Sequence, residues 1–236
     1  MRGLLSAQEA RHFVAGIDTA MAARAASGEG DHAEESWYAP FPLPNNQKLR
    51  ETRPWVESGG GLWTVDSPRM LFDLMETLKD KRIDRLVGDY FGERPAISVG
   101  KSTLRCVPLT AGTEWHQDGA FLGRDIRTVN LWIALTPCGV DAPGLDMIPR
   151  RLSSIVQTGT HGTLFDWSVG HEMAMQAAQG RPLVSPHFKA GDAVFFDQLL
   201  LHRTGMRPSM TRKRWAIESW FFAPSSYPME QEPLVV

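Results

Sequence analysis

The chain has 236 residues, of which 42% are hydrophobic, so it can bury a substantial core without dividing into several domains. Its formal net charge of -2 shows no basic excess, which argues against nucleic acid or an anionic membrane as the principal partner. No apolar run is long enough to cross a bilayer and no signal-peptide pattern follows Met1, so we expect a cytoplasmic protein. The two cysteines, Cys106 and Cys138, lack the spacing of a disulfide framework or a zinc site.

The first helix is predicted near the N-terminus. Ser6-Ala7-Gln8-Glu9 has the form of a capping box, in which serine and glutamate side chains satisfy each other's backbone N–H groups. The alanine-rich sequence that follows continues to about Ala25, with Phe13, Ile17 and Met21 on one face. This pattern predicts a helix that covers an apolar surface.

A loop and a second helix follow. Residues 37–55 are rich in proline and aromatic side chains, which excludes long regular elements. Asp66-Ser67-Pro68 then begins a helix that we expect to extend to about Tyr90. Its apolar positions recur at helical spacing, namely Leu71, Leu74, Leu78, Ile83 and Leu86.

From Ile97 onward the pattern changes to short strands separated by Gly, Pro and Asp. Helices followed by strands favour segregated layers over a parallel α/β sheet, and a jelly roll with helices on one sheet fits this order. The segment 153–179 interrupts the strands and predicts a loop with a short helix, in a place where enzymes often carry a lid.

The segment around His116 carries the strongest chemical signal. In an extended strand, residues two apart project from the same face, so His116 and Asp118 would aim an imidazole and a carboxylate at one point. His202, far downstream, supplies a candidate third ligand. Two histidines and one carboxylate on one side of a metal form the facial triad of non-haem Fe(II) oxygenases, with positions left open.

Several segments in a fixed order resemble a known family. They are Trp115-His116-Gln117-Asp118-Gly119, Asn130-Leu131-Trp132-Ile133-Ala134-Leu135, Gly191-Asp192-Ala193-Val194-Phe195-Phe196-Asp197, His202-Arg203-Thr204-Gly205 and Arg214-Trp215-Ala216-Ile217. Together they resemble the phytanoyl-CoA dioxygenase family of Fe(II)/2-oxoglutarate-dependent oxygenases, over roughly residues 95 to 223. The resemblance implies a mainly β fold with flanking helices, the double-stranded β-helix or cupin-like jelly roll, with N-terminal helices packed on one sheet.

We expect one domain over residues 1–236, with a helical support to about residue 94 and a short tail after residue 223. The strand 127–135 illustrates the expected arrangement. Its aliphatic face, with Val129, Leu131, Ile133 and Leu135, would meet the helices. Its mixed face, with Thr128, Asn130, Trp132 and Ala134, would line the barrel interior where ligands bind, although Trp132 and Asn130 could equally be core residues.

The resemblance also implies the cofactors. Fe(II) would be held by His116, Asp118 and His202, and 2-oxoglutarate and O2 would fill its open positions. A buried carboxylate of 2-oxoglutarate suits a guanidinium, which offers two parallel donors, and Arg214 stands where the family places such an arginine. Thr204 matches a family Ser or Thr that donates to the same carboxylate.

Other basic residues are candidates for anion binding. Lys101, Thr103 and Arg105 share a strand face and could meet the 1-carboxylate of 2-oxoglutarate, or they could be exposed. Four scattered arginines could attract an anionic substrate or be solvated, namely Arg124, Arg127, Arg150 and Arg151. Two departures from the family pattern, Arg207 in place of an asparagine and the turn 149–152, put the identity of the substrate in doubt.

The resemblance favours an enzyme that hydroxylates a C–H bond of a small organic or lipid-like molecule and releases succinate and CO2. Related halogenases replace the carboxylate ligand by a small residue, so Asp118 argues against halogenation. Two alternatives stay open, namely a non-catalytic sensor of metal or 2-oxoglutarate, and a cupin-type enzyme that uses another divalent metal for hydrolysis or isomerisation. The substrate and the oligomeric state are not specified by the sequence.

Overall fold

The computed structural model describes residues 1–26, 37–38, 56–123, 125–160, 162–228 and 233–235. Most of the predicted loop 37–55 and Arg124 lie outside these residues. The described helices include α1 (Ala7–Ala26), α3 (Pro68–Asp80), α4 (Ile83–Phe91), α5 (Gly119–Leu122), α6 (His171–Ala178) and the 3-10 turns η1 (Thr64–Asp66) and η2 (Pro224–Ser226). The strands are β1 (Gly61–Trp63), β2 (Ala96–Ser98), β3 (Thr103–Val107), β4 (Thr128–Ala134), β5 (Gly144–Met147), β6 (Ala193–Asp197), β7 (His202–Gly205), β8 (Arg214–Phe222) and β9 (Pro233–Val235).

The larger sheet is centred on β8. This strand pairs with β3 along its first half and with β2 near its end, while β4 lies along its other edge and pairs in turn with β6. β1 extends the sheet beyond β3, and β9 extends it beyond β2. All these pairs are antiparallel, and two of the strands, β1 and β9, lie outside the range in which we expected strands.

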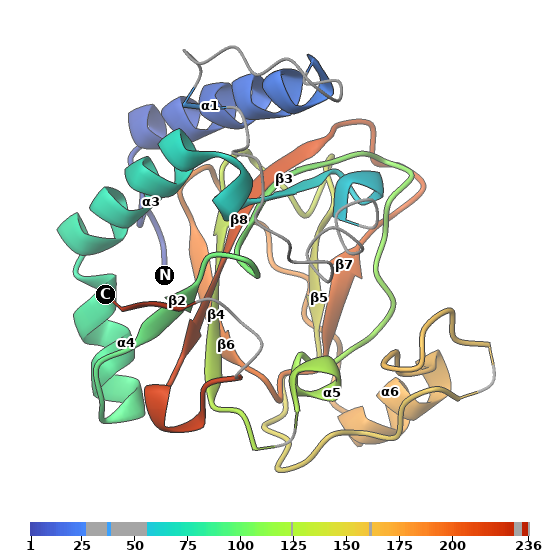
Figure 1. The fold of residues 1–236 in the computed structure, drawn as a ribbon. Helices are drawn as coiled ribbons and strands as arrows, with labels where there is room; N and C mark the ends of the chain where they lie inside the picture. Colours follow the sequence, from blue (N-terminus) through green and yellow to red (C-terminus); the bar gives the residue numbers. More distant parts are fainter. Residues whose placement is uncertain (27–36, 39–55, 124, 161, 229–232, 236) are drawn as a thin grey trace.

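A second, smaller layer faces this sheet. It consists of β5 paired with β7, and isolated bridges add His116 beside His202 and Val184 beside Met147. Figure 1 shows β5 and β7 on the opposite side of the large sheet from α3 and α4. Two antiparallel layers with helices outside one of them match the predicted jelly roll.

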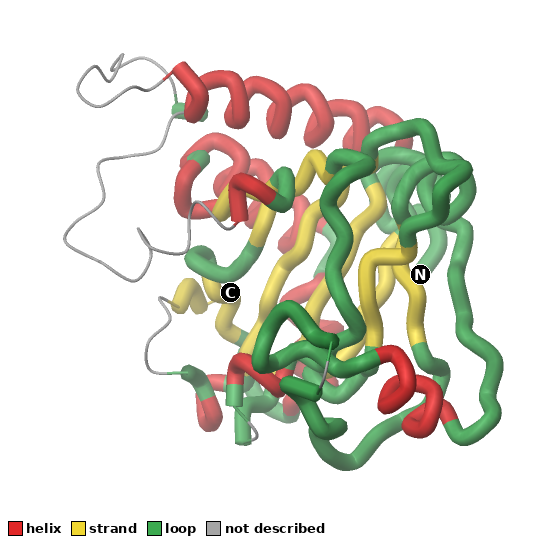
Figure 2. Tube along the Cα trace, turned by 90° about the vertical axis from the view of Figure 1, so that its right-hand side faces the viewer, coloured by secondary structure: helices red, strands yellow, loops and turns green. Residues whose placement is uncertain are grey.

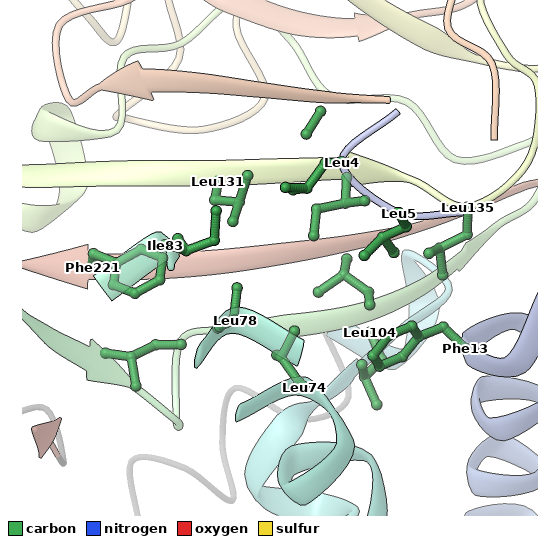
Figure 3. Packing of buried hydrophobic residues seen from close by; sticks show 14 of the residues in the cluster. Leu4, Leu5, Phe13, Leu74, Leu78, Ile83, Leu104, Leu131, Leu135 and Phe221 are labelled. Carbon is green, nitrogen blue, oxygen red and sulfur yellow. The ribbon is translucent and has the colours of Figure 1, made fainter. Parts of the chain in front are cut away.

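Helices cover the outer face of the large sheet. Figure 2 shows α1 running across one end of the strands. Figure 3 shows Phe13 of α1 and Leu74 and Leu78 of α3 facing Leu104 and Leu131 of the sheet. Burial of each such side chain contributes about 1.5–3 kcal/mol, so this aliphatic layer is a main source of stability.

The N-terminal capping box is confirmed. The backbone N–H of Ser6 donates to Glu9 Oε2 at 2.6 Å, and the N–H of Glu9 donates to Ser6 Oγ at 3.2 Å. Phe13 and Ile17 lie on the helix that follows the capping box, and both are buried, as the periodicity of this helix predicts. Among the described residues, no helix is both long and apolar enough to cross a membrane.

The second predicted helix is two helices. Leu78 and Ile83 are both buried, but five residues along one helix would separate them by about 140°. The chain instead turns at Lys81 and Arg82, and Arg82 adopts a left-handed φ of 57°. Each helix then buries positions four apart, which are Met70, Leu74 and Leu78 in α3 and Ile83, Val87 and Phe91 in α4. Leu86 follows the apolar spacing of the single helix expected here, but it is 44% exposed because α4 buries a different face.

The alternation predicted for β4 is confirmed. Val129, Leu131 and Ile133 belong to the core beneath the helices. Trp132 and Ala134 belong to a separate cluster on the inner side, with Phe188, Phe196 and Ala216. The inner residues of β4 therefore face the space between the two layers, where the predicted site lies.

Candidate active site

Backbone pairing brings His116 and His202 together. The N–H of His116 donates to the carbonyl of His202 at 2.9 Å, and the N–H of His202 donates back at 3.0 Å. Residues that exchange both hydrogen bonds in an antiparallel pair project their side chains from the same face. The ring centres consequently lie 4.3 Å apart, although the two residues are far apart in sequence.

Asp118 reaches the same point from a turn rather than from a strand. Extended pairing ends at His116, and Asp118 has helical backbone angles (φ -59°, ψ -32°) at the start of α5. The assumption of a continuous strand through this pair was therefore wrong in its detail. Gly119 N–H donates to the carbonyl of Gln198 at 3.0 Å and holds the turn against the segment that precedes β7.

Gln117, which the sequence did not single out, fixes this arrangement from the opposite side. Its buried side-chain amide donates to the carbonyls of Leu199 (2.7 Å) and Ser154 (3.2 Å). Its oxygen accepts from the N–H of Val156 at 2.7 Å. One side chain thus joins the turn of His116 to the approach to His202 and to the 153–179 segment.

Three ligand atoms converge in a buried site. Asp118 Oδ1 lies 3.7 Å from His116 Nε2 and 3.8 Å from His202 Nε2, and the three ligand atoms lie within 4.8 Å of one another. The side chains of His116, Asp118 and His202 are 12%, 2% and 7% exposed. These separations suit three donors around one ion.

The histidine rings are oriented for metal binding. His116 Nδ1 lies 2.8 Å from the carbonyl of Glu114, and His202 Nδ1 lies 3.0 Å from the carbonyl of Leu200. A carbonyl only accepts, so each Nδ1 carries the proton and each Nε2 lone pair faces the site. This tautomer is the one that donates to a metal through Nε2.

The charges in the site favour the binding of a cation. Burial raises the pKa of Asp118 to about 7, an effect that the neighbouring His116 partly offsets. Burial, together with the nearby His202, lowers the pKa of His116 to about 4, and burial also lowers the pKa of His202. Neither Asp118 oxygen has a full hydrogen bond among the described residues, although Asn130 approaches closely enough to lower its pKa. Two neutral imidazoles and an unpaired buried carboxylate fit a divalent ion such as Fe(II).

Arg214 lies inside the barrel at the start of β8 and is 2% exposed. Its Nη1 donates to the carbonyl of Gly144 at 3.0 Å, and its guanidinium carbon lies 5.3 Å from the centre of the Trp132 ring. Among the described residues it has no ion-pair partner, and its Nε and the Trp132 Nε1 have no acceptor. A buried guanidinium beside an unpaired indole N–H fits the distal carboxylate of 2-oxoglutarate.

Thr204 lies near this pocket rather than against Arg214. It sits on β7, next to Gly205, which pairs with Gly144. Its backbone N–H donates to Thr113 Oγ1 at 2.8 Å, and its own hydroxyl receives a hydrogen bond from Thr113 at 3.1 Å. The Thr204 hydroxyl proton remains available for an acceptor inside the barrel.

Thr103 and Arg105 both bind Glu218, a residue that the sequence analysis did not identify. Glu218 Oε2 accepts from Thr103 Oγ1 at 2.9 Å, and Glu218 Oε1 lies 2.8 Å from Arg105 Nε. Glu218 shares the inward face of β8 with Arg214, because the two are four residues apart on one strand. This alternation is the sequence signal that could have identified Glu218 as an inward-facing residue. The charge of Arg105 is therefore balanced within the barrel wall.

Aromatic side chains surround the metal ligands. The rings of Trp167 and Phe196 lie 5.5 Å from His116 and 4.6 Å from His202, respectively. Phe121 lies 6.3 Å from His116, and Phe165 stacks on Trp167 at 4.7 Å. Trp167 and Phe165 come from the 153–179 segment, so this segment forms part of the site wall.

Two of the four arginines suggested for substrate attraction have partners away from the metal ligands. Arg127 donates to the carbonyl of Phe91 and pairs with Glu93, and Arg150 donates to the carbonyl of Ala177. A cavity of about 660 Å³ includes Arg150 and Arg151 in its lining but none of the predicted site residues.

The departure at Arg207 has a structural reason. Arg207 contacts both oxygens of the buried Asp146, at 2.7 and 3.2 Å. Arg203 and Ser185 also donate to this carboxylate. Arg207 thus stabilises the β5–β7 layer from its outer side.

The fold and this constellation of side chains define a double-stranded β-helix protein of the non-haem iron oxygenase type. The chain belongs to the phytanoyl-CoA dioxygenase (PhyH) family, whose model matches residues 65–214, more than half of its length. It is thereby a 2-oxoglutarate-dependent oxygenase. No curated protein sequence matches the chain significantly.

Solved structures share the fold at low sequence identity. EctD from S. alaskensis, solved with 2-oxoglutarate and 5-hydroxyectoine, is 17% identical, with a TM-score of 0.64 over 96% of this chain and 72% of EctD. The non-heme monooxygenase ThoJ is 18% identical, with a TM-score of 0.59 over 98% and 76%. The epimerase SnoN, solved with Fe3+, alpha ketoglutarate and nogalamycin RO, is 16% identical, with a TM-score of 0.57 over 94% and 77%.

Proposed function

We propose that this chain is a non-haem Fe(II)/2-oxoglutarate-dependent dioxygenase that hydroxylates a C–H bond of a small organic molecule. Substrate, 2-oxoglutarate and O2 would yield hydroxylated product, succinate and CO2. One observation carries the proposal, which is the convergence of His116, Asp118 and His202 in the same barrel interior as Arg214, which is buried and has no ion-pair partner among the described residues. When bound, Fe(II) with 2-oxoglutarate and O2 supplies the oxidising chemistry.

Each residue has a defined task in this proposal. His116 and His202 donate through Nε2, and Asp118 contributes the negative charge that neutralises half of the ion's charge. Arg214 binds the distal carboxylate of 2-oxoglutarate, with further hydrogen bonds from the Trp132 indole N–H and the Thr204 hydroxyl. Phe121, Trp167 and Phe196 restrict the access of water to the metal ligands.

The test combines product analysis with metal binding. Purified protein receives Fe(II), 2-oxoglutarate, air and a panel of small molecules, and mass spectrometry measures succinate together with a gain of one oxygen in the substrate. His202→Ala should lower Fe(II) affinity at least about 10-fold and abolish succinate formation. His171→Ala is the matched control, because His171 is exposed on α6 and should leave both properties unchanged.

The outcomes separate the alternatives. Succinate formation with substrate altered but without added oxygen would replace hydroxylation by another outcome, such as epimerisation or desaturation. Binding of metal and 2-oxoglutarate without turnover of any panel compound would identify a sensor. Metal-dependent conversion that needs no 2-oxoglutarate would identify a hydrolase or isomerase and would contradict the proposal.

A further inference from the structure

A lysine lies among three aromatic rings beside the metal ligands. Lys101 Nζ lies 4.6 Å from the ring centre of Phe121, 5.5 Å from that of Trp220 and 5.9 Å from that of Trp63. Lys101 is half-buried, and aromatic faces attract an ammonium group at such a position. The position of the Lys101 charge is thus set by its surroundings.

Two unpaired donors accompany this charge. Trp63 and Trp220 are each 5% exposed, and their indole Nε1 atoms have no acceptor among the described residues. A buried N–H is unfavourable without an acceptor, so such a group indicates that a ligand or a water molecule supplies one. Both indoles belong to rings whose centres lie within 6 Å of Lys101 Nζ.

This cluster lies at the metal centre but away from the Arg214 pocket. Phe121 bridges the two regions, since its ring is 6.3 Å from His116 and 5.9 Å from Trp220. Burial raises the pKa of Asp118, and the charge of Lys101 is near enough to oppose part of this rise. Arg214 and Trp220 are six residues apart on β8, so their α-carbons are separated by about 20 Å along the strand. Lys101 is therefore too distant to share the carboxylate assigned to Arg214.

We propose that Lys101, with the indole N–H groups of Trp63 and Trp220, forms a subsite that binds a carboxylate of the primary substrate. Phe121 and Trp167 would pack against the apolar part of that molecule, next to the metal ligands. The inference rests on the proposed function and narrows its substrate class to small organic acids. One carboxylate would bind Arg214 as part of 2-oxoglutarate, and a second, on the substrate, would bind Lys101.

The experiment measures whether this subsite recognises charge. Wild-type protein with Fe(II) and 2-oxoglutarate is titrated calorimetrically without oxygen against 3-phenylpropionate, indole-3-acetate and hexanoate, each compared with its neutral carboxamide. A charge-assisted hydrogen bond contributes about 1.5–3 kcal/mol, so at least one acid should bind about 10-fold or more tightly than its amide. Lys101→Met should remove that preference and leave the Kd for 2-oxoglutarate within about twofold.

Two further variants separate recognition from structure. Trp63→Phe keeps an aromatic ring but removes one N–H, so it should weaken binding of the preferred acid about 2- to 10-fold. Binding of the amide should weaken less, because a neutral carbonyl accepts a weaker hydrogen bond than a carboxylate does. Lys79→Met, on the exposed side of α3, is the control and should change nothing. Circular dichroism of each variant shows whether the fold is intact.

Three results would overturn the subsite. The first is that no acid of the series binds more tightly than its amide to the wild type. The second is that Lys101→Met retains the preference. The third is that Lys101→Met raises the Kd for 2-oxoglutarate about 10-fold, which would show that the lysine binds the cosubstrate instead. Failure of the proposed function is distinct, because it is measured on the wild type alone, as the absence of 2-oxoglutarate binding or of succinate formation.

Discussion

The two faces of β4 differ in kind. On the outer face, Leu131 and Ile133 pack against aliphatic side chains and leave no polar atom to satisfy. On the inner face, Asn130 Oδ1 and Trp132 Nε1 are buried without hydrogen-bond partners among the described residues. Alternate residues of one strand thus serve stability and ligand binding separately, and the unsatisfied inner atoms mark where ligands are expected.

The largest effect should come from an inner residue that holds the metal. Asp118→Ala should lower succinate formation at least about 1000-fold, because a buried site with two neutral imidazoles and no carboxylate binds a divalent ion poorly. The metal-free variant should melt at or above the wild-type temperature, because an unpaired buried carboxylate is removed. Succinate analysis and a thermal melt of metal-free protein measure both quantities. Unchanged turnover would show that Asp118 is not a ligand.

Arg214→Ala should act on the cosubstrate. Loss of one partner of a buried, hydrogen-bonded charge pair costs about 2–5 kcal/mol, which predicts a Kd for 2-oxoglutarate raised at least about 30-fold. Fe(II) affinity measured without 2-oxoglutarate should stay the same, since Arg214 is not one of the three metal ligands. Arg212→Ala is the matched control, because Arg212 lies on the same segment but is exposed. An unchanged Kd would move this role to another basic residue.

Leu131→Ala tests the outer face of the same strand. Removing a fully buried leucine creates a cavity and should lower the free energy of unfolding by about 3–4 kcal/mol. Turnover per folded molecule should change less than about twofold, because Leu131 points away from the barrel interior. Urea unfolding followed by circular dichroism and an assay at low temperature measure the two effects. A large loss of turnover in folded protein would show that the faces are not independent.

The smallest effect is expected in the β5–β7 layer and depends on pH. Burial opposes ionisation of Asp146, but hydrogen bonds from Arg207, Ser185 and Arg203 outweigh it and lower the pKa. A lowered pKa in the folded state stabilises the protein above the ordinary aspartate range, and this contribution is lost as pH falls through the folded-state value. Asp146→Asn should therefore cost about 1–3 kcal/mol at pH 7.

The difference between Asp146→Asn and wild type should shrink below about pH 4, where the unfolded-state carboxyl becomes protonated. Urea unfolding at pH 7 and at successively lower pH measures this change. Arg181→Gln is a control that should show little pH dependence, because the Arg181 side chain is exposed and, among the described residues, donates only to the Pro149 carbonyl. A cost that stays constant down to pH 3 would contradict the assigned ion pairs.

Local patterns were sufficient for much of this molecule. Period-two alternation specified the two faces of β4, and the capping box specified the start of α1, because each depends on residues close in sequence. The combination of His116, Asp118, His202 and Arg214 was also visible, because separate motifs occur in a recognisable order. The break between α3 and α4 could have been found, since the five-residue step from Leu78 to Ile83 violates helical periodicity.

The remaining features depend on contacts between segments distant in sequence. Only the reciprocal hydrogen bonds of His116 and His202 decide that their side chains meet, and only strand pairing brings Glu218 to Thr103 and Arg105. Lys101 and Trp220 are separated by more than a hundred residues, and no local pattern reports that they share a cluster. The sequence by itself determined which side chains had ligand chemistry, whereas long-range packing and register decided which of them share one buried space.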